Sequence, residues 1–158
     1  MIILGIDPGT AMTGYGIIEC DKKTKKIKSL KHGSIKTSNN DDSSTRLRLI
    51  HQEVLSIIKD NKPQILAIES LFFNSNAKSA SAVGQAIGVT KLAACLNKME
   101  VFEYPPLKIK MKLVGKGRAE KKQVQSKVKQ MLRLKKTPRP THAADALAVA
   151  ICHWLENQ

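Results

Sequence analysis

Residues 2–10 read Ile2-Ile3-Leu4-Gly5-Ile6-Asp7-Pro8-Gly9-Thr10, a short apolar strand that ends at an acid and runs into a turn. Proline and glycine interrupt regular structure, so we expect the strand to stop at Asp7. Two more strand-like stretches follow, Tyr15–Cys20 and Ile27–Lys36, with the polar segment Asp21–Lys26 between them. Short connections of this kind join antiparallel neighbours, and the three strands are therefore predicted to form a meander.

The next part of the chain predicts a helix followed by a buried strand. From Asp41 to Lys59, apolar residues recur at steps of three and four behind a polar capping cluster at 42–44. The stretch Ile65–Glu69 is nearly continuously apolar, which is typical of a strand buried on both faces. The order strand, helix, strand makes this strand a parallel partner of an earlier one.

The remaining segments predict alternating helices and one strand. A helix rich in small side chains is expected over residues 77–98, then a strand Val101–Tyr104 that Pro105-Pro106 ends. Two further helices are expected at Glu120–Leu132 and His142–Glu156. With no internal repeat, residues 1–158 are predicted to form one α/β domain, a mixed five-stranded sheet flanked by helices.

The composition indicates a polyanionic partner. The 158 residues include 27 Lys and Arg against 13 Asp and Glu, a formal net charge of +14. No apolar run reaches the roughly 18 residues of a membrane span, and the strand-like N-terminus does not resemble a signal peptide. We expect a cytoplasmic protein that does not enter membranes, with Cys20, Cys95 and Cys152 as buried thiols in a reducing compartment.

Three acids are predicted to meet at one edge of the sheet. Asp7 and Glu69 each close a strand, and the carboxyl ends of neighbouring parallel strands, about 4.8 Å apart, face one crevice. Asp145 stands among alanines in the first turn of the last helix, on the same helical face as His142. Three such carboxylates repel by roughly 4 kcal/mol per pair at about 4 Å, unless a cation lies among them.

Oxygen ligands open to a phosphate are typical of Mg²⁺ or Mn²⁺, and two such ions support phosphodiester hydrolysis. Each of these acids can instead have a purely structural role, without a metal. Asp7 can shape the Pro-Gly turn, Asp145 can favour a helix N-terminus through the helix dipole, and Glu69 can pair with a lysine.

The ordered motifs resemble those of the RuvC family of Holliday-junction endonucleases. They are Gly5-Ile6-Asp7-Pro8-Gly9-Thr10 with Gly14-Tyr15-Gly16, then Ile68-Glu69, then His142-Ala143-Ala144-Asp145-Ala146-Leu147-Ala148. The resemblance spans the chain and implies an RNase H-like fold, a homodimer, paired symmetric nicks in recombination and repair, and a branch-migration helicase as partner. It implies metal ligation by the matching Asp7, Glu69, His142 and Asp145.

One position departs from the common family pattern. Many members carry Asp where this chain has His142. Imidazole favours Mn²⁺ over Mg²⁺ relative to carboxylate, and it ligates only when neutral. If His142 is a ligand, we predict more activity with Mn²⁺ than with Mg²⁺ and a rise of activity through roughly pH 6.5. The alternative is that His142 only begins the helix.

A basic segment is predicted to contact DNA. Between Lys108 and Arg139 there are thirteen basic residues and one acid, Glu120, but no aromatic residue of the kind that a membrane-binding helix uses. The resemblance places Lys110 and Lys121 beside the scissile phosphate, where a lysine offsets transition-state charge. Further DNA-binding candidates are Lys112, Lys116, Arg118 and Lys122.

Phe72 is expected to stack on an unpaired base at the junction centre, or else to anchor its loop to the core.

Three other functions remain open on sequence grounds. Asp7-Pro8-Gly9-Thr10 followed by Gly14 also resembles the phosphate loop of actin-like ATPases and sugar kinases, but 158 residues leave no room for their second domain. A nuclease acting on structured RNA and a non-catalytic basic binding module both fit the charge. For a homodimer, the helix at 77–98 is the expected interface, since its small side chains permit close packing.

Overall fold

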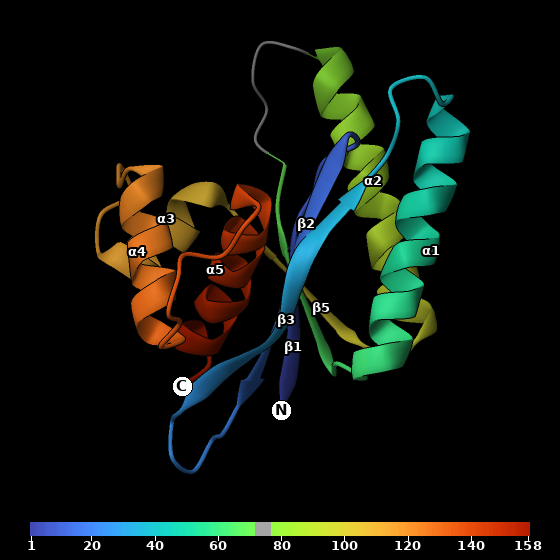
Figure 1. Ribbon diagram of the computed structural model, residues 1–158. Helices are drawn as coiled ribbons and strands as arrows, with labels where there is room; N and C mark the ends of the chain where they lie inside the picture. The colour runs from blue at the N-terminus through green and yellow to red at the C-terminus, as the bar shows by residue number, and fades with distance from the viewer. Residues whose placement is uncertain (72–76) are drawn as a thin grey trace.

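The computed structural model describes residues 1–71 and 77–158. In this part of the chain a single mixed sheet runs through the molecule (Figure 1), in the order β3-β2-β1-β4-β5. Its strands are β1 (Ile2–Asp7), β2 (Met12–Cys20), β3 (Ile27–Lys36), β4 (Ile65–Glu69) and β5 (Glu100–Tyr104). The first three form the predicted antiparallel meander, and β4 pairs in parallel with both β1 and β5. The predicted five-stranded mixed sheet is confirmed.

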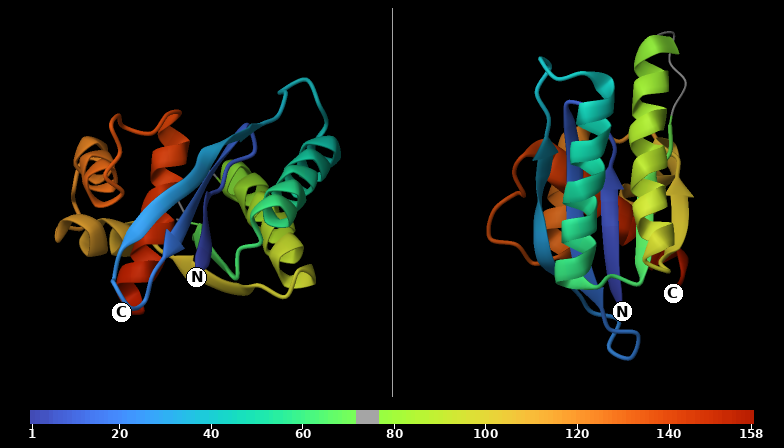
Figure 2. Two further views of the ribbon diagram at one scale, coloured as in Figure 1. Left: turned by 60° about the horizontal axis from the view of Figure 1, so that its bottom comes forward. Right: turned by 90° about the vertical axis from the view of Figure 1, so that its right-hand side faces the viewer.

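Helices cover both faces of the sheet. α1 (Ser43–Asn61) and α2 (Ala77–Leu96) lie side by side on one face, and α3 (Pro106–Val114), α4 (Lys121–Met131) and α5 (Thr141–Glu156) lie on the other (Figures 1 and 2). The strand β4 serves both layers, because Leu66 and Ile68 face the α1 and α2 core while Ile65 and Ala67 face the α5 core. This alternation explains the continuous apolar run at 65–68.

Helix α3 was not predicted, because Pro105-Pro106 was interpreted only as the end of a strand. Pro106 instead starts the helix, at a position where proline's missing N–H costs no hydrogen bond. The helix buries Ile109 and Leu113, four residues apart, and ends at Gly115 with φ of 81°. The apolar spacing typical of a helix is therefore present here, within a segment in which lysines alternate with apolar residues.

Helix α5 lies unusually close to the sheet because glycines leave room for it. A Cβ atom added to Gly5 would lie 2.1 Å from the carbonyl oxygen of Ala146, and one added to Gly14 would lie 2.1 Å from that of His142. Real side chains do not tolerate such distances, so these positions on β1 and β2 need glycine. Their effect is to bring the first turn of α5 down onto the end of β1.

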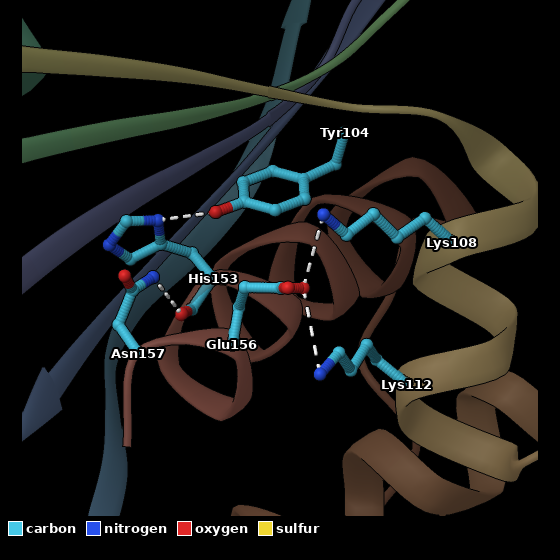
Figure 3. A network of polar contacts seen from close by, with 6 residues as sticks. All are labelled: Tyr104, Lys108, Lys112, His153, Glu156 and Asn157. Atoms are coloured by element: carbon cyan, nitrogen blue, oxygen red, sulfur yellow. Dashed lines mark hydrogen bonds and ion pairs between the residues drawn. The ribbon is translucent and has the colours of Figure 1, made fainter.

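A buried polar network holds the other end of α5 (Figure 3). The hydroxyl of Tyr104, at the end of β5, lies 2.7 Å from Nδ1 of His153. The ring of His153 also contacts that of Phe102, with the centroids 4.6 Å apart and the planes tilted by 49°. The pKa of His153 is lowered by burial, so the neutral ring is favoured. Both ends of α5 are thus fixed relative to the sheet.

The cysteine prediction is correct for two residues and wrong for the third. Cys20 and Cys152 are buried, whereas Cys95 is exposed on α2. Its neighbours Ala93 and Ala94 are buried, but the apolar Leu92 and Leu96 are exposed as well. The apolar sequence around Cys95 therefore does not identify the buried face of the helix. Among the described residues, no helix is both long and apolar enough to span a bilayer.

Candidate active site

Two of the predicted acids close neighbouring parallel strands. Ile6 of β1 lies opposite Ile68 of β4, and Asp7 and Glu69 are the next residues of the two strands. Both carboxyls therefore leave the sheet at the carboxyl end of a parallel pair, where α/β sheets collect their ligands. The turn after Asp7 is fixed by the buried Thr13, whose hydroxyl donates to the carbonyl oxygen of Gly9 at 2.6 Å.

The first turn of α5 brings two more side chains to this edge. Nδ1 of His142 lies 2.7 Å from Oδ2 of Asp7, and one ligand atom from each of Asp7, His142 and Asp145 lies within 4.8 Å of the others. The Asp7 and Asp145 side chains are 17% and 20% exposed, and that of His142 is 40% exposed. The cluster is thus recessed but open to a substrate on one side.

The electrostatics of the cluster favour a bound cation. Burial raises the pKa of Asp7, partly opposed by the hydrogen bond from His142, and Asp145 raises it further. Burial raises the pKa of Glu69 to about 7, and the charges of Asp7 and Asp145 act in the same direction. Keeping these carboxylates charged and close together lowers the stability of the folded protein. A bound divalent metal would offset this repulsion.

The donor set also fits a metal of the expected class. Carboxylate oxygens with one imidazole nitrogen suit Mg²⁺ or Mn²⁺, the second more strongly once a nitrogen takes part. Asp7, His142 and Asp145 are therefore the residues that could hold an ion, with Glu69 beside them on the adjacent strand.

One of the predicted lysines contacts the cluster, and a second acts on it through its charge. Nζ of Lys121 lies 2.5 Å from Oδ2 of Asp145, and the positive charges of Lys121 and Lys110 both lower the pKa of Glu69. Lys121 is placed there by the start of α4, where Glu120 and Gln123 form a capping box. Its side chain remains 54% exposed and thus accessible to a phosphate.

The other predicted DNA-binding residues lie in different surroundings. Lys116, Arg118 and Lys122 are exposed around the start of α4. Lys112 is not brought to the cluster: its Nζ lies 3.7 Å from Oε2 of Glu156, at the far end of α5 (Figure 3). Residues two apart on a helix face different sides, so Lys110 and Lys112 on α3 cannot share a target. Phe72 lies outside the described residues.

Three residues that shape the site were missed by the sequence analysis. Gly5 and Gly14 admit α5, and Thr13 fixes the turn that follows Asp7. Glycines inside a strand are a known signal of close backbone approach, and that signal was present in Gly14-Tyr15-Gly16. Thr13 gave no comparable signal.

Comparisons with known proteins agree with this geometry. The family model "Crossover junction endodeoxyribonuclease RuvC" matches residues 3–153. A protein of that name from Natranaerobius thermophilus is 49% identical over 153 residues, which cover 97% of this chain and 94% of the relative. The structure of Thermus thermophilus RuvC superposes with a TM-score of 0.91 at 35% identity, covering 99% of this chain and 95% of that one.

A second structure of Thermus thermophilus RuvC was solved in complex with a Holliday junction substrate. It matches at 32% identity with a TM-score of 0.90, again covering 99% of this chain and 95% of that one. These similarities confirm the RNase H-like fold and favour the expected endonuclease over the RNA nuclease and the non-catalytic binding module. On this evidence the chain belongs to the RuvC family of crossover junction endodeoxyribonucleases.

Proposed function

We propose that this endonuclease resolves Holliday junctions by paired symmetric nicks, in homologous recombination and DNA repair in the cytoplasm. Residues 1–158 act as one nuclease domain. The observation that carries the proposal is the convergence of Asp7, His142 and Asp145 beside Lys121 in a chain of this family. A Thermus thermophilus relative of the same fold bound to a junction supports DNA as the polyanion that the net charge of +14 demands.

We further propose that Asp7, Glu69, His142 and Asp145 hold two divalent ions, Mg²⁺ or Mn²⁺. Such ions, when bound, lower the pKa of water and stabilise the leaving oxygen of a phosphodiester. The support for this assignment is that Asp7 and Glu69 are largely buried near the carboxylate of Asp145, and that burial and this neighbouring charge raise the pKa of both acids.

The protein's own residues orient and neutralise the reacting groups. The hydrogen bond between His142 and Asp7 fixes the position of one carboxylate oxygen of Asp7. A fixed carboxylate restricts the orientations in which a substrate phosphate can bind at this edge of the sheet. Lys121 reaches the same pocket from the start of α4, and its ammonium can move from Asp145 to a phosphate oxygen. A positive group at this place offsets the charge that develops in hydrolysis.

Paired nicks need two active sites. We propose that a second copy of this chain supplies the second site, and that the two copies form a homodimer in which α2 is the interface. Four residues at a spacing of four form one stripe on this helix: Gly84, Gly88, Leu92 and Leu96. Leu92 and Leu96 are 52% and 67% exposed, and a Cβ added to either glycine meets no atom within 4 Å. A branch-migration helicase as further partner follows from the family resemblance.

The test is cleavage of a four-way DNA junction compared with a linear DNA duplex and a four-way RNA junction. We expect Mg²⁺- or Mn²⁺-dependent nicks in the DNA junction only. Asp7→Asn removes a charge from the cluster and should abolish them, while Asp60→Asn, an exposed change at the end of α1, should leave them intact. Equal cleavage of linear duplex, or an active Asp7→Asn protein, would contradict the proposal.

A further inference from the structure

The turn between β2 and β3 carries a group of lysines that the proposed function does not use. Four of the six positions from 21 to 26 are lysine, and all four are exposed: Lys22, Lys23, Lys25 and Lys26. The turn lies at the end of the sheet opposite to the catalytic edge, because Asp7 pairs with Gly14 near the start of β2 (Figure 1). We call these four lysines the hairpin surface.

The hairpin surface borders a hollow of about 1080 Å³, and one further basic residue, Arg133, lines its other side. Across from the turn, the hollow is lined by the end of α4 and by Arg133. Its two acidic side chains have local partners: Asp21 accepts bonds from Lys23 N and from Thr24, and Glu19 pairs with Lys28 at 2.6 Å. Among the described residues, no ion pair engages the four lysines of the hairpin surface.

Helix α4 connects this hollow to the catalytic edge. It begins at Lys121, which contacts Asp145, and ends at Met131, which lines the hollow. Its 11 residues span about 16 Å at 1.5 Å per residue. The exposed Lys122 and the half-buried Lys129 lie seven residues apart on this helix, and therefore on one side of it. One polyanion can therefore contact basic groups continuously from the catalytic edge to the hairpin surface.

The spacing suits a DNA backbone. From Gly14, which pairs with Asp7, to Asp21 the strand covers about 23 Å at about 3.3 Å per residue. Successive phosphates of one strand rise by about 3.4 Å, so this length equals about seven nucleotides. Basic groups that face one another across a hollow repel unless an anion neutralises them, and the anion already expected here is the junction.

We propose that the hairpin surface, with Arg133 opposite, binds the backbone of the same junction arm that is cut, about seven base pairs from the cleaved phosphate. This contact rests on the proposed function and adds a second, distal anchor to it. The continuity of charge along α4 favours DNA over an acidic protein as the occupant.

The experiment measures junction affinity as a function of salt, without metal. The hairpin variant is Lys22→Gln/Lys23→Gln/Lys26→Gln, and the matched control is Lys59→Gln/Lys62→Gln/Lys98→Gln, which removes three exposed charges beside α1 and α2. We expect the slope of log Kd against log salt to fall by about one per lysine and the affinity at 0.1 M salt to fall about tenfold in the hairpin variant. The control should change by less than about twofold.

A modified junction locates the contact. Neutral methylphosphonate linkages are placed six to nine nucleotides from the mapped cut in one arm. They should weaken binding of the unmodified protein and have no further effect on the hairpin variant. Two results would overturn the inference while the proposed function stands, provided that the unmodified protein cuts the junction. One is a hairpin variant that binds with the affinity of the control variant. The other is a methylphosphonate junction that binds more weakly, by the same factor, to the unmodified protein and to the hairpin variant. If the protein does not cut at all, both fail.

Discussion

At the scale of single residues, Glu69 combines a buried position with two acidic neighbours. Its pKa is raised from the 4.5 of a free glutamate to about 7. Between these two values the folded protein binds more protons than the unfolded chain, so the free energy of unfolding falls as pH rises through this window. Above about pH 7 the full cost of the charged carboxylate is present in metal-free protein.

Glu69→Gln should therefore stabilise the metal-free protein at pH 8 by about 3 kcal/mol and have little effect at pH 4.5. Urea unfolding in the presence of a chelator measures this difference, with Glu53→Gln on the exposed side of α1 as control. Adding Mg²⁺ at pH 8 should remove the advantage of the variant. A Glu69→Gln protein that is less stable than the parent at pH 8 would show that the carboxylate is satisfied without metal.

Nδ1 of His142 lies 2.7 Å from Asp7, so an imidazole nitrogen is available beside the carboxylates of the cluster. Nitrogen ligands favour Mn²⁺ over Mg²⁺ relative to carboxylate, so Mn²⁺ should support more junction cleavage than Mg²⁺. His142→Asp replaces the imidazole with a carboxylate and should shift the preference towards Mg²⁺, measured as cleavage rates with each metal. Equal rates with both metals in the parent protein and in His142→Asp would contradict a ligand role.

At the scale of elements, the site depends on how closely α5 approaches β1 and β2. A Cβ at Gly14 would lie 2.1 Å from the carbonyl oxygen of His142, so Gly14→Ala must displace the first turn of the helix. Displacements near 1 Å cost about a hundredfold in rate, and overpacking costs about 1–3 kcal/mol in stability.

Cleavage rates and unfolding of Gly14→Ala measure both effects. The control is Gly117→Ala, where the nearest atom is an ordinary 3.7 Å away. Normal cleavage by the Gly14→Ala protein would mean that the position of α5 is not critical.

The elements also show what sequence could and could not predict. Strands and amphipathic helices followed from apolar spacing, and Asp7, Glu69 and Asp145 followed from their places at element ends. Helix α3 was missed because its prolines suggested an end, although Pro106 is its beginning. Lys112 was grouped with Lys110 by charge alone, but helical geometry turns it towards Glu156. Side-chain direction within a basic run depends on tertiary contacts that a linear pattern lacks.

At the scale of the whole molecule, two copies of the site are needed for paired nicks. Leu92→Glu/Leu96→Glu places charges on the exposed stripe of α2 and should give a monomer in sedimentation experiments. The control Leu107→Glu/Met111→Glu adds the same charges at residues of similar exposure on α3 and should remain dimeric. A dimeric α2 variant would place the interface elsewhere.

The central claim is that Asp7, His142 and Asp145, with Glu69 beside them, form a cation site. Calorimetric titration of Mn²⁺ at pH 8 into the parent protein, Asp7→Asn, Asp145→Asn and the distant Asp60→Asn tests it most directly. We predict that the parent and Asp60→Asn bind with the same affinity, while each cluster variant binds at least about tenfold more weakly. Equal Mn²⁺ affinity in all four proteins would contradict the account.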